Sequence, residues 1–497
     1  MKGLEQTIKK KLMNIISKYK YLPKPAKSFF WFMVCNFFLK GISFLSAPIF
    51  TRLLTDSEYG KLTLFLTYEQ IINILATWEI QNGAYQKGLF KYEKMKKEYT
   101  IATQLQIGLM TSFLFIIMIP FYRLIHSLTK FNSILVFLLY LSILIKPSYD
   151  CWLIRKRMDY EYKVPVLIIF IYSISNIFFP ILMINLIKAN ANVKFGTNLI
   201  ISILLGIFFY IQNIDYRALK NMADSVKKYW IFNIHFQGPA VLHSLSYLIL
   251  SQADRIMIDK YVSSKEVAYY SVAYSIASVV SIVQTSLIQS LRPWFYSTIE
   301  RREFLLLRRG TFGLVAGVGC IVIVFLGVIP EVIRFVFPSN YSESLWCIPP
   351  ITVGIYFVFL YSLFVTYEEY YEKTQYVMYV SVICAIINIL LNYFGIKVWG
   401  YIACAYTTLI SYIFFAFGHY LFMERVRIDE NSDEKPFYIR GLFGISIGVC
   451  IMSLGIILLY NHPIIRYIFL GGLLLILLYM RERIFDFIKN VLRKTNM

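Results

Sequence analysis

The sequence predicts an all-α integral membrane protein with about 14 transmembrane helices. The 497-residue chain is 58% hydrophobic and only 16% charged, whereas soluble proteins carry charges on about a quarter of their residues. Apolar stretches of roughly the 20 residues that a bilayer requires follow one another from Phe29 to Met480. The short loops between them alternate between rich and poor in Lys and Arg.

Each predicted span is an apolar run with the length of a transmembrane helix. Spans 7 and 8 exceed the thickness of a bilayer, so they must tilt or extend beyond it. Spans 13 and 14 are almost entirely aliphatic, with glycines, which indicates a lipid-facing or peripheral position. The expected spans are residues 29–51, 59–84, 100–121, 132–154, 163–187, 196–216, 229–257, 266–296, 305–329, 345–370, 375–394, 398–422, 437–460 and 463–480.

The basic residues predict the orientation of the spans. If residues 1–28 lie on one side and the chain changes side at each span, that side collects 36 Lys and Arg, the other collects 9, and 5 lie inside spans. The positive-inside rule makes the rich side cytoplasmic, so both termini face the cytoplasm and the number of spans is even. The net charge of +21 is dispersed through loops, whereas a nucleic-acid partner requires basic residues gathered on one face.

A repeat relates the two halves of the chain. Residues 54–63 read LTDSEYGKLT between spans 1 and 2, and residues 262–271 read VSSKEVAYYS between spans 7 and 8. Both have an aliphatic residue, a hydroxyl-bearing N-cap and a Glu before an aromatic-rich helix. An offset of six spans preserves orientation, which predicts parallel repeats about an axis along the membrane normal, as in some transporters. We expect a basic cytoplasmic segment at 1–28, an N-lobe at 29–216, a C-lobe at 217–424, and spans 13 and 14 with a cytoplasmic tail at 425–497.

Polar side chains recur along spans 1, 2, 7 and 8, which correspond to one another in the two repeats. Lys40 shares one helical face with Asn36 and Ser43. An ionisable group in hydrocarbon costs about 2.5 to 3.5 kcal/mol and usually faces a cavity or a partner, so the pattern predicts a water-filled cleft. The alternative is that these groups only join helices, or that they reach the membrane interface. The other residues of this pattern are Glu69, Gln70, Asn73, Thr77, Glu79, Asn233, Gln237, Ser244, Ser251, Arg255, Tyr270, Tyr274, Ser278, Ser281, Thr285 and Arg292.

Two further features belong to the spans themselves. Lys146 and Asp150 lie four residues apart in span 4, close enough to pair. Pro48 and Pro239 interrupt spans 1 and 7, and a proline removes a backbone hydrogen bond and bends a helix. Flexing at these positions would open or close a cleft, although static kinks explain the prolines equally well.

Motifs of catalysis and metal binding are missing from the sequence. The seven Cys occur singly, without the spacing of metal ligands, so we expect no metal site. There is no phosphate-binding glycine loop or nucleophile elbow. The carboxylates that lie closest together are Glu368, Glu369 and Glu372, which we interpret as a solvated helix end.

Two stretches resemble a known family. Residues 36–42, NFFLKGI, with residues 48–60, PIFTRLLTDSEYG, resemble the opening of the Wzx-type oligosaccharide flippases, which belong to the multidrug/oligosaccharidyl-lipid/polysaccharide exporter superfamily. Residues 253–258, ADRIMI, with Glu266 and residues 270–274, YSVAY, resemble the junction between that family's seventh and eighth spans. Ala268 departs from the family, in which Gly is common at this position. With the span number, the resemblance extends over nearly the whole chain.

The resemblance implies a flippase that moves an undecaprenyl-diphosphate-linked oligosaccharide from the cytoplasmic to the outer leaflet of a bacterial plasma membrane. Two lobes would alternate access, driven by H⁺ or Na⁺ and without a cofactor, for O-antigen of lipopolysaccharide or another surface polysaccharide. The aliphatic last spans would hold the polyprenyl tail. The implied partners are membrane lipid, a polysaccharide polymerase and a chain-length regulator, with no nucleic acid. The implied substrate-binding residues are Lys40, Arg52, Lys146, Arg255 and Arg292, and the implied counter-charges or ion-coupling residues are Glu69, Glu79, Asp150 and Asp254.

Three alternatives remain open at this point. A lipid II flippase would share the fold and the cationic cleft. A multidrug exporter that exchanges cations would share the fold with a net acidic cleft, whereas the candidates here mix basic and acidic side chains. A polytopic polysaccharide polymerase would require a sizeable outward loop with catalytic residues, and the largest expected outward loop, around 331–344, has only about a dozen residues.

Overall fold

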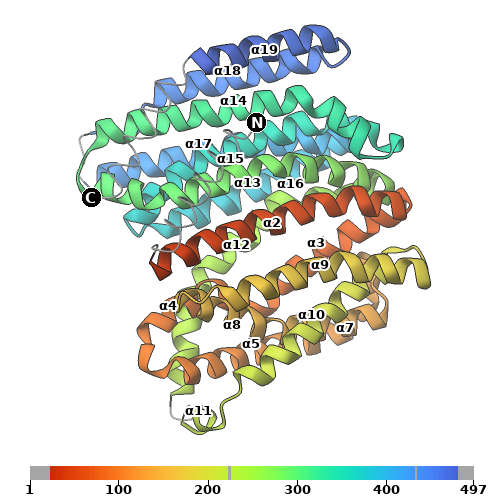
Figure 1. Cartoon of the computed structure of the whole chain (residues 1–497), viewed down its shortest axis with the longest axis vertical. Coiled ribbons are helices and arrows are strands. Elements are labelled where there is room, and N and C mark those ends of the chain that lie inside the picture. Colours follow the sequence, from red (N-terminus) through yellow and green to blue (C-terminus); the bar gives the residue numbers. More distant parts are fainter. Residues whose placement is uncertain (1–22, 222–224, 431–433, 480–497) are drawn as a thin grey trace, which may run out of the picture. The chain divides into compact units, whose positions relative to one another are not determined.

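The computed structural model of the chain describes residues 23–221, 225–430 and 434–479, and within these ranges every regular element is a helix (Figure 1). Contacts between residues divide the chain into two compact units. Unit 1 comprises Met1–Ser46 and Leu75–Gly238, and unit 2 comprises Ala47–Ile74 and Pro239–Met497. The boundaries of these units differ from those of the lobes expected from the repeat, at 29–216 and 217–424. The lobe assignment stays a prediction.

Unit 1 is built mainly around α10, which packs against α7, α8 and α9, while α5 packs against α7. A cluster of buried tyrosines, Tyr85, Tyr92, Tyr99 and Tyr229, joins α4, α5 and α12. The elements of unit 1 are the first part of α2 (Lys24–Leu53), η1 (Ile80–Asn82), α4 (Ala84–Lys91), η2 (Glu93–Met95), α5 (Lys96–Met118), η3 (Ile119–Phe121), α6 (Tyr122–Thr129), α7 (Ser133–Ile145), α8 (Pro147–Met158), α9 (Lys163–Leu186), α10 (Ala191–Asn213), α11 (Tyr216–Asn221) and the first part of α12 (Val226–Tyr261).

Unit 2 has α15 as its core helix. In the most apolar stretch of α15, 83% of the residues are buried, because α13 and α17 pack against it. α16 packs on α17, and α14 packs on α18. The elements of unit 2 are the end of α2, nearly all of α3 (Asp56–Thr77), the second part of α12, α13 (Ser264–Glu300), α14 (Phe304–Val336), η4 (Ser339–Trp346), α15 (Ile348–Tyr370), α16 (Thr374–Trp399), α17 (Ile402–Asp429), α18 (Ile439–Leu458) and α19 (Pro463–Tyr479).

The helices confirm the predicted class of an all-α membrane protein. In the described ranges, eleven helical segments are long and apolar enough to cross a membrane, and each coincides with a predicted span. The other three predicted spans also form helices: α19 is shorter, and α3 and α12 carry many polar residues. The eleven segments are Phe30–Leu53, Glu93–Thr129, Ser133–Met158, Lys163–Leu186, Ala191–Asn213, Ser264–Glu300, Phe304–Val336, Ile348–Tyr370, Gln375–Trp399, Ile402–Asp429 and Ile439–Leu458.

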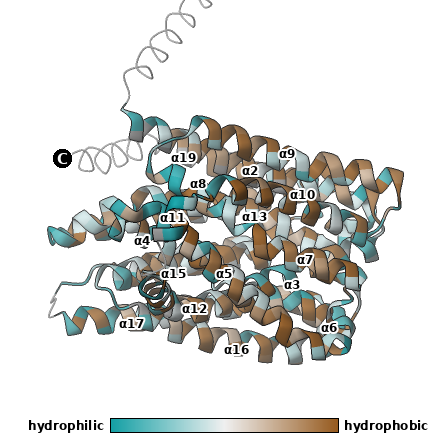
Figure 2. Cartoon of the chain, turned by 90° about the horizontal axis from the view of Figure 1, so that it is seen from below, coloured by the Kyte–Doolittle hydropathy of each residue, from teal (hydrophilic) through white to brown (hydrophobic). Residues whose placement is uncertain are grey.

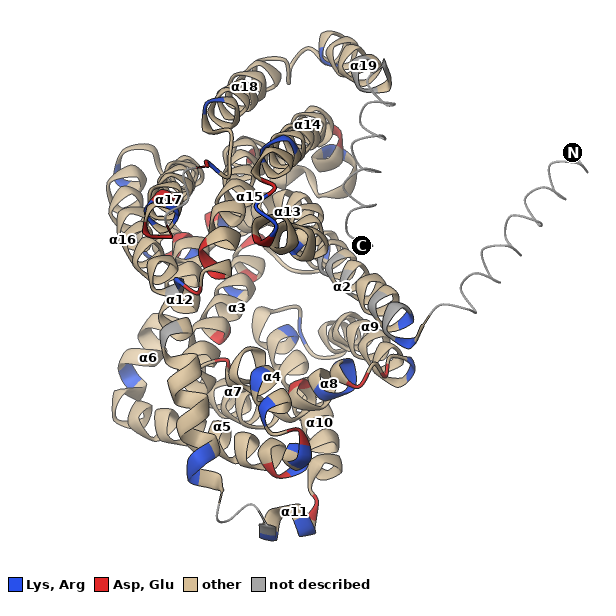
Figure 3. Cartoon of the chain, turned by 90° about the vertical axis from the view of Figure 1, so that its left-hand side faces the viewer, with Lys and Arg blue, Asp and Glu red and all other residues tan. Residues whose placement is uncertain are grey.

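Large apolar side chains cover the outside of many helices. On α18 and α19, Phe443, Leu458 and Ile468 are among those that are more than half exposed. Figure 2 shows hydrophobic residues along the middle of the helices, and Figure 3 shows how few Lys, Arg, Asp and Glu the helices carry. Such apolar surface is far larger than the patches of soluble proteins. The chain is therefore a multi-pass membrane protein, and α18 and α19 have the apolar exposure expected of a lipid-facing pair.

The two repeated junctions form helix starts as the sequence predicts. Thr55 caps α3 by accepting a hydrogen bond from the backbone N–H of Glu58 at 3.3 Å. At the corresponding position, Ser263 caps α13 by accepting one from the N–H of Lys265 at 3.1 Å, and its hydroxyl also donates to Glu266. The N-cap interpretation is thereby confirmed at both sites.

The two junctions also cross each other within unit 2. Gly60 lies against α13, where a Cβ added to it would be 1.7 Å from the carbonyl oxygen of Ser264. Further along the same pair of helices, the Ser271 hydroxyl donates to that of Thr63 at 3.1 Å. Thr63 and Ser271 occupy equivalent positions of the two repeated stretches, 54–63 and 262–271. The crossing therefore depends on a residue without a side chain at position 60.

We expect Gly60→Ala to destabilise the protein by at least about 1 to 3 kcal/mol, because the new methyl group overlaps a backbone atom that cannot turn aside. The measurement is the melting temperature of the purified protein in detergent. Gly317→Ala in α14 is the control, since no atom lies within 4 Å of its added Cβ. Equal melting temperatures for both variants would refute the close crossing.

Candidate functional site

The most deeply buried carboxylate near the α12–α13 junction is that of Asp254, which is 0% exposed. Its two oxygens accept three hydrogen bonds, from the hydroxyl of Tyr270, from that of Thr408 at 2.9 Å, and from the amide of Asn392 at 2.5 Å. These donors come from α13, α17 and α16. The carboxylate therefore joins four helices of unit 2 at one point.

A second layer of polar groups surrounds these donors. The Asn388 amide donates to Thr408 at 3.3 Å, Asn392 donates to Asn388 at 3.0 Å, and Thr407 donates to the side-chain oxygen of Asn392. All of them are buried. We call the set of Asp254, Tyr270, Asn388, Asn392, Thr407 and Thr408 the Asp254 cluster. It concentrates carboxylate, amide and hydroxyl oxygens, the ligands that hard cations such as Na⁺ prefer.

Arg255 follows Asp254 in α12 and has its own set of partners. Its Nε donates to Ser271 at 3.1 Å, and its Nη1 donates to the carbonyl of Ser251 at 3.3 Å and to the side chain of Gln252. The guanidinium lies 4.8 Å from the ring centre of Tyr274. These hydrogen-bond and ring partners are all uncharged, and they hold the guanidinium in a buried position, 7% exposed, while the neighbouring carboxylate of Asp254 interacts with its charge.

The Arg255 site and the crossing of the repeats share one residue. Ser271 accepts from Arg255 and donates to Thr63. Tyr270, the preceding residue, donates to Asp254. Consecutive residues of α13 therefore contact the carboxylate and the guanidinium, which are themselves consecutive in α12.

The other predicted cations of unit 2 lie at its periphery. Arg52 is exposed and donates to the carbonyl of Val336 at 2.8 Å, so it caps the end of α14. Arg292 is 44% exposed and forms an ion pair with Glu369 at 3.0 Å. Glu69, predicted as a counter-charge, is half-buried in α3.

Unit 1 holds the remaining predicted residues. Lys146 and Asp150 are both half-buried at the start of α8, where the charges of Lys146 and Arg157 act on Asp150. Lys40 is part of α2, but its side chain lies outside the described residues, as do those of Asn36 and Ser43. The substrate and coupling roles of all nine residues stay predictions.

Two sequence interpretations are wrong. Span 2 does not continue to Glu79, because α3 ends at Thr77 and both Trp78 and Glu79 adopt a left-handed backbone with φ 51°. The acidic helix end at 368–372 is not solvated throughout, because Glu368 is 0% exposed. The spacing of residues along the chain does not indicate where the backbone of α3 leaves the helix, nor which carboxylate of α15 packing will bury.

Sequence reasoning missed the parts of the Asp254 cluster that α16 and α17 contribute. Asn388 and Asn392 lie four residues apart on one face of an apolar helix, and Thr407 and Thr408 lie in α17. An i, i+4 pair of amides in a span is a signal of an inward-facing polar site.

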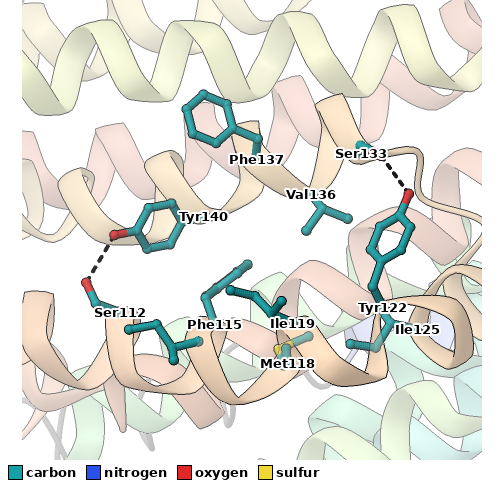
Figure 4. Close-up of a pocket in the computed structure, with 11 residues that line it drawn as sticks. Ser112, Phe115, Met118, Ile119, Tyr122, Ile125, Ser133, Val136, Phe137 and Tyr140 are labelled. Carbon is teal, nitrogen blue, oxygen red and sulfur yellow. Dashed lines mark hydrogen bonds between the residues drawn. The ribbon is translucent and has the colours of Figure 1, made fainter.

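A cavity in unit 1 has a different character. Figure 4 shows this space of about 500 Å³ between α5, α6 and α7, lined mainly by apolar side chains such as Phe115, Ile119 and Phe137. Two hydrogen bonds lie beside it, one between the hydroxyls of Ser112 and Tyr140 at 3.1 Å and one between those of Tyr122 and Ser133 at 2.7 Å. Because no charged side chain lines it, it offers nothing to a phosphate.

The fold is similar to that of solved transporter structures. The lipid II flippase MurJ in an inward closed conformation matches with a TM-score of 0.59 and 16% identity over 91% of this chain and 99% of its own. An inward-facing multidrug resistance MATE family transporter of the MOP superfamily matches with a TM-score of 0.63 and 12% identity over 81% of this chain and 100% of its own. An outward-facing MATE family transporter of the MOP superfamily matches with a TM-score of 0.60 and 12% identity over 82% of this chain and 97% of its own. At these identities the likeness establishes the fold.

The sequence identifies the family within that fold. Residues 26–299, more than half of the chain, match the family described as "Polysaccharide biosynthesis protein", and the chain belongs to this family. The "Lsg locus putative protein 1" of Haemophilus influenzae is 21% identical over 364 residues, which are 70% of this chain and 86% of that protein. The resemblance to the Wzx-type flippases is confirmed by the family match and the shared fold.

We expect Thr408→Val to lower the stability of the protein by about 1.5 to 3 kcal/mol, because it removes a hydrogen bond to a buried carboxylate without changing the side-chain shape. Chemical unfolding of the purified protein measures the loss. Thr352→Val is the matched control, since Thr352 is also buried but donates only to Ile348 of its own helix at 2.8 Å. The same loss in both variants would show that Asp254 does not depend on Thr408.

Proposed function

We propose that this protein is a transporter that moves a lipid-linked oligosaccharide across the bacterial plasma membrane, from the cytoplasmic to the outer leaflet, for the synthesis of a surface polysaccharide. The observation that carries the proposal is the combination of membership in a polysaccharide biosynthesis family with a fold shared by a lipid II flippase. The substrate is an undecaprenyl-diphosphate-linked oligosaccharide such as an O-antigen repeat unit of lipopolysaccharide. Both termini lie in the cytoplasm, and a polymerase and a chain-length regulator act on the product.

A buried cation supports the proposed substrate. A diphosphate that leaves water for a low-dielectric site requires compensating positive charge, and guanidinium binds phosphate oxygens well. Arg255 meets this requirement because its charge is held in place by uncharged partners. Lys40, Arg52, Lys146 and Arg292 are the further candidates along the path.

The polyprenyl tail requires an apolar path beside the charged one. Unit 2 contains a space of about 620 Å³ between α15, α17 and α18, lined by apolar side chains that include Phe364, Phe414 and Phe443, with Arg440 at its border. We assign the tail to this space, where burial of each CH₂ group contributes about 0.8 kcal/mol.

Conformational change between two access states requires hinges. The chain passes between the two units within α2 at 46–47, within α3 at 74–75 and within α12 at 238–239. Pro48 lies within α2 next to the first point, Pro239 lies within α12 at the third, and the left-handed residues Trp78 and Glu79 follow the end of α3 near the second. We assign the hinges to these three positions.

The Asp254 cluster is the proposed coupling-ion site, with Na⁺ as the ion. Its carboxylate and the amide and hydroxyl oxygens around it fit a hard monovalent cation. A cation bound to the Asp254 carboxylate would displace the hydrogen bonds that Tyr270, Asn392 and Thr408 donate to it. Binding would therefore change the contacts of α12, α13, α16 and α17 together.

Translocation of the substrate tests the proposed function. In liposomes that contain the purified protein, a fluorescent undecaprenyl-diphosphate oligosaccharide should become accessible to an impermeant quencher. Arg255→Ala should slow the translocation of the labelled lipid by about tenfold or more, because it removes the guanidinium that would bind the diphosphate; tenfold corresponds to about 1.4 kcal/mol. Arg255→Lys should slow translocation less, because it keeps the positive charge. Arg334→Ala is the control, because Arg334 is an exposed cation at the end of α14.

Two results would overturn the proposed function. One is wild-type protein that leaves the labelled oligosaccharide in its original leaflet while it transports soluble organic cations, as a multidrug exporter would. The other is movement of the lipid that is as fast with Arg255→Ala as with wild type. If lipid II moved as fast as the labelled oligosaccharide, the transport of polyprenyl diphosphates would stand and the specificity for an oligosaccharide substrate would be refuted.

Ion binding is tested without substrate. Saturating Na⁺ should raise the melting temperature relative to the same concentration of choline, because a ligand at about 100 times its Kd stabilises the folded state by about 2.7 kcal/mol. Asp254→Asn should abolish the difference. Asp429→Asn, which changes an exposed carboxylate at the end of α17, should retain it. An unchanged Na⁺ effect in Asp254→Asn would exclude the Asp254 cluster as the site.

A further inference from the structure

A second buried ionisable pair lies in unit 2, apart from the Asp254 cluster. Glu368 in α15 and His419 in α17 are both 0% exposed. The Nδ1 atom of His419 lies 3.2 Å from each of the two carboxylate oxygens of Glu368. Neither residue contributes to the Asp254 cluster or to the contacts of Arg255.

Aromatic rings enclose the imidazole of His419. The ring of Tyr361 stacks on it with a centroid distance of 5.3 Å, and the ring of Phe415 meets it edge-on at 4.8 Å. Its other nitrogen, Nε2, is buried and has no hydrogen-bond partner in the described structure. The imidazole of His419 therefore has a polar contact with Glu368 and is otherwise packed against aromatic rings.

Four further titratable or charged groups face the pair from the helices packed around it. Glu369 follows Glu368 in α15, and its charge is offset by Arg292 of α13 at 3.0 Å. His243 of α12 bonds Ser381 of α16 at 2.7 Å. Tyr361 presents its ring to His419. Since Glu369 already has its counter-charge, the charge of the Glu368–His419 pair must be balanced by the pair itself.

The number of protons on the pair decides its charge. With no proton beyond that of neutral imidazole, the pair carries one negative charge in an apolar wall, which is costly. One added proton makes the pair neutral, whether it resides on the carboxylate or on the imidazole. A second would leave a net positive charge, at a similar cost. The surroundings therefore favour the form with one added proton.

We propose that Glu368 and His419 form a proton-binding site, distinct from the Asp254 cluster, that takes up one proton from water and returns it to water during the conformational cycle. The Arg292–Glu369 pair lies next to Glu368 in the chain and is partly exposed, so we assign the entry of water to this side. The use of this proton to drive transport rests on the proposed function. Proton binding itself does not.

Proton counting on the purified protein tests the site without substrate. When the pH falls from about 9 to about 5, a range in which exposed glutamates stay mostly ionised, the wild type should take up about one proton more than Glu368→Gln. Glu369→Gln is the matched control and should take up as many protons as wild type. Asp254→Asn should keep the additional proton.

A second variant guards against misfolding of the first. His419→Gln should also lose the titration, because an isolated carboxyl group in an apolar wall stays protonated throughout the range. The infrared spectrum of His419→Gln minus that of the double variant with Glu368→Gln, recorded at the same pH, should then show a carboxylic-acid band that is equal at about pH 9 and about pH 5. Equal proton uptake by wild type, Glu368→Gln and His419→Gln would overturn the proposal.

The role of the proton is measured separately in liposomes. Translocation of the labelled lipid should accelerate about tenfold with an imposed pH gradient in wild type and not in Glu368→Gln. If proton counting succeeds and wild type moves no lipid, the proton site stands and the proposed function fails. If lipid moves and proton uptake is the same in all variants, the proposed function stands and the proton site is refuted.

Discussion

The constraint on which this structure depends is that a polar group within a membrane must find its partners inside the protein. Lipid offers no hydrogen bonds, so a buried carboxylate such as Asp254 is tolerated only where other helices supply donors. Here Tyr270, Asn392 and Thr408 supply them from three helices.

Close packing of backbones makes this pairing feasible. The absence of a side chain at Gly60 lets α3 approach the first turn of α13, and the next turn of that crossing brings Thr63 to Ser271. Ser271 in turn holds Arg255. Ser271 thus links the close crossing of the repeated stretches to the buried guanidinium. A substitution that moves α3 relative to α13 would therefore also move the contacts of Arg255.

The Asp254 cluster and the Glu368–His419 pair, both in the described part of unit 2, differ in chemistry. The Asp254 cluster surrounds a carboxylate with amides and hydroxyls, which suits a cation with oxygen ligands. The Glu368–His419 pair has an imidazole and an aromatic wall, which suits a proton. Two separate ion sites in one bundle would allow two gradients to bias one conformational equilibrium, because each ion acts through its own difference in affinity between states.

The sequence by itself determined the membrane class, the order of the helices, the capped starts of α3 and α13, and the family, because hydrophobic run length and N-cap chemistry are local properties. It also singled out Arg255 as a charge within a span, and the family resemblance implied a role for Asp254. Only the tertiary structure decided which charges are buried and with what partners. Asn392 and Thr408 reach Asp254, and His419 reaches Glu368, across more than fifty residues of sequence, and a linear pattern of polarity does not state which faces of distant helices will meet.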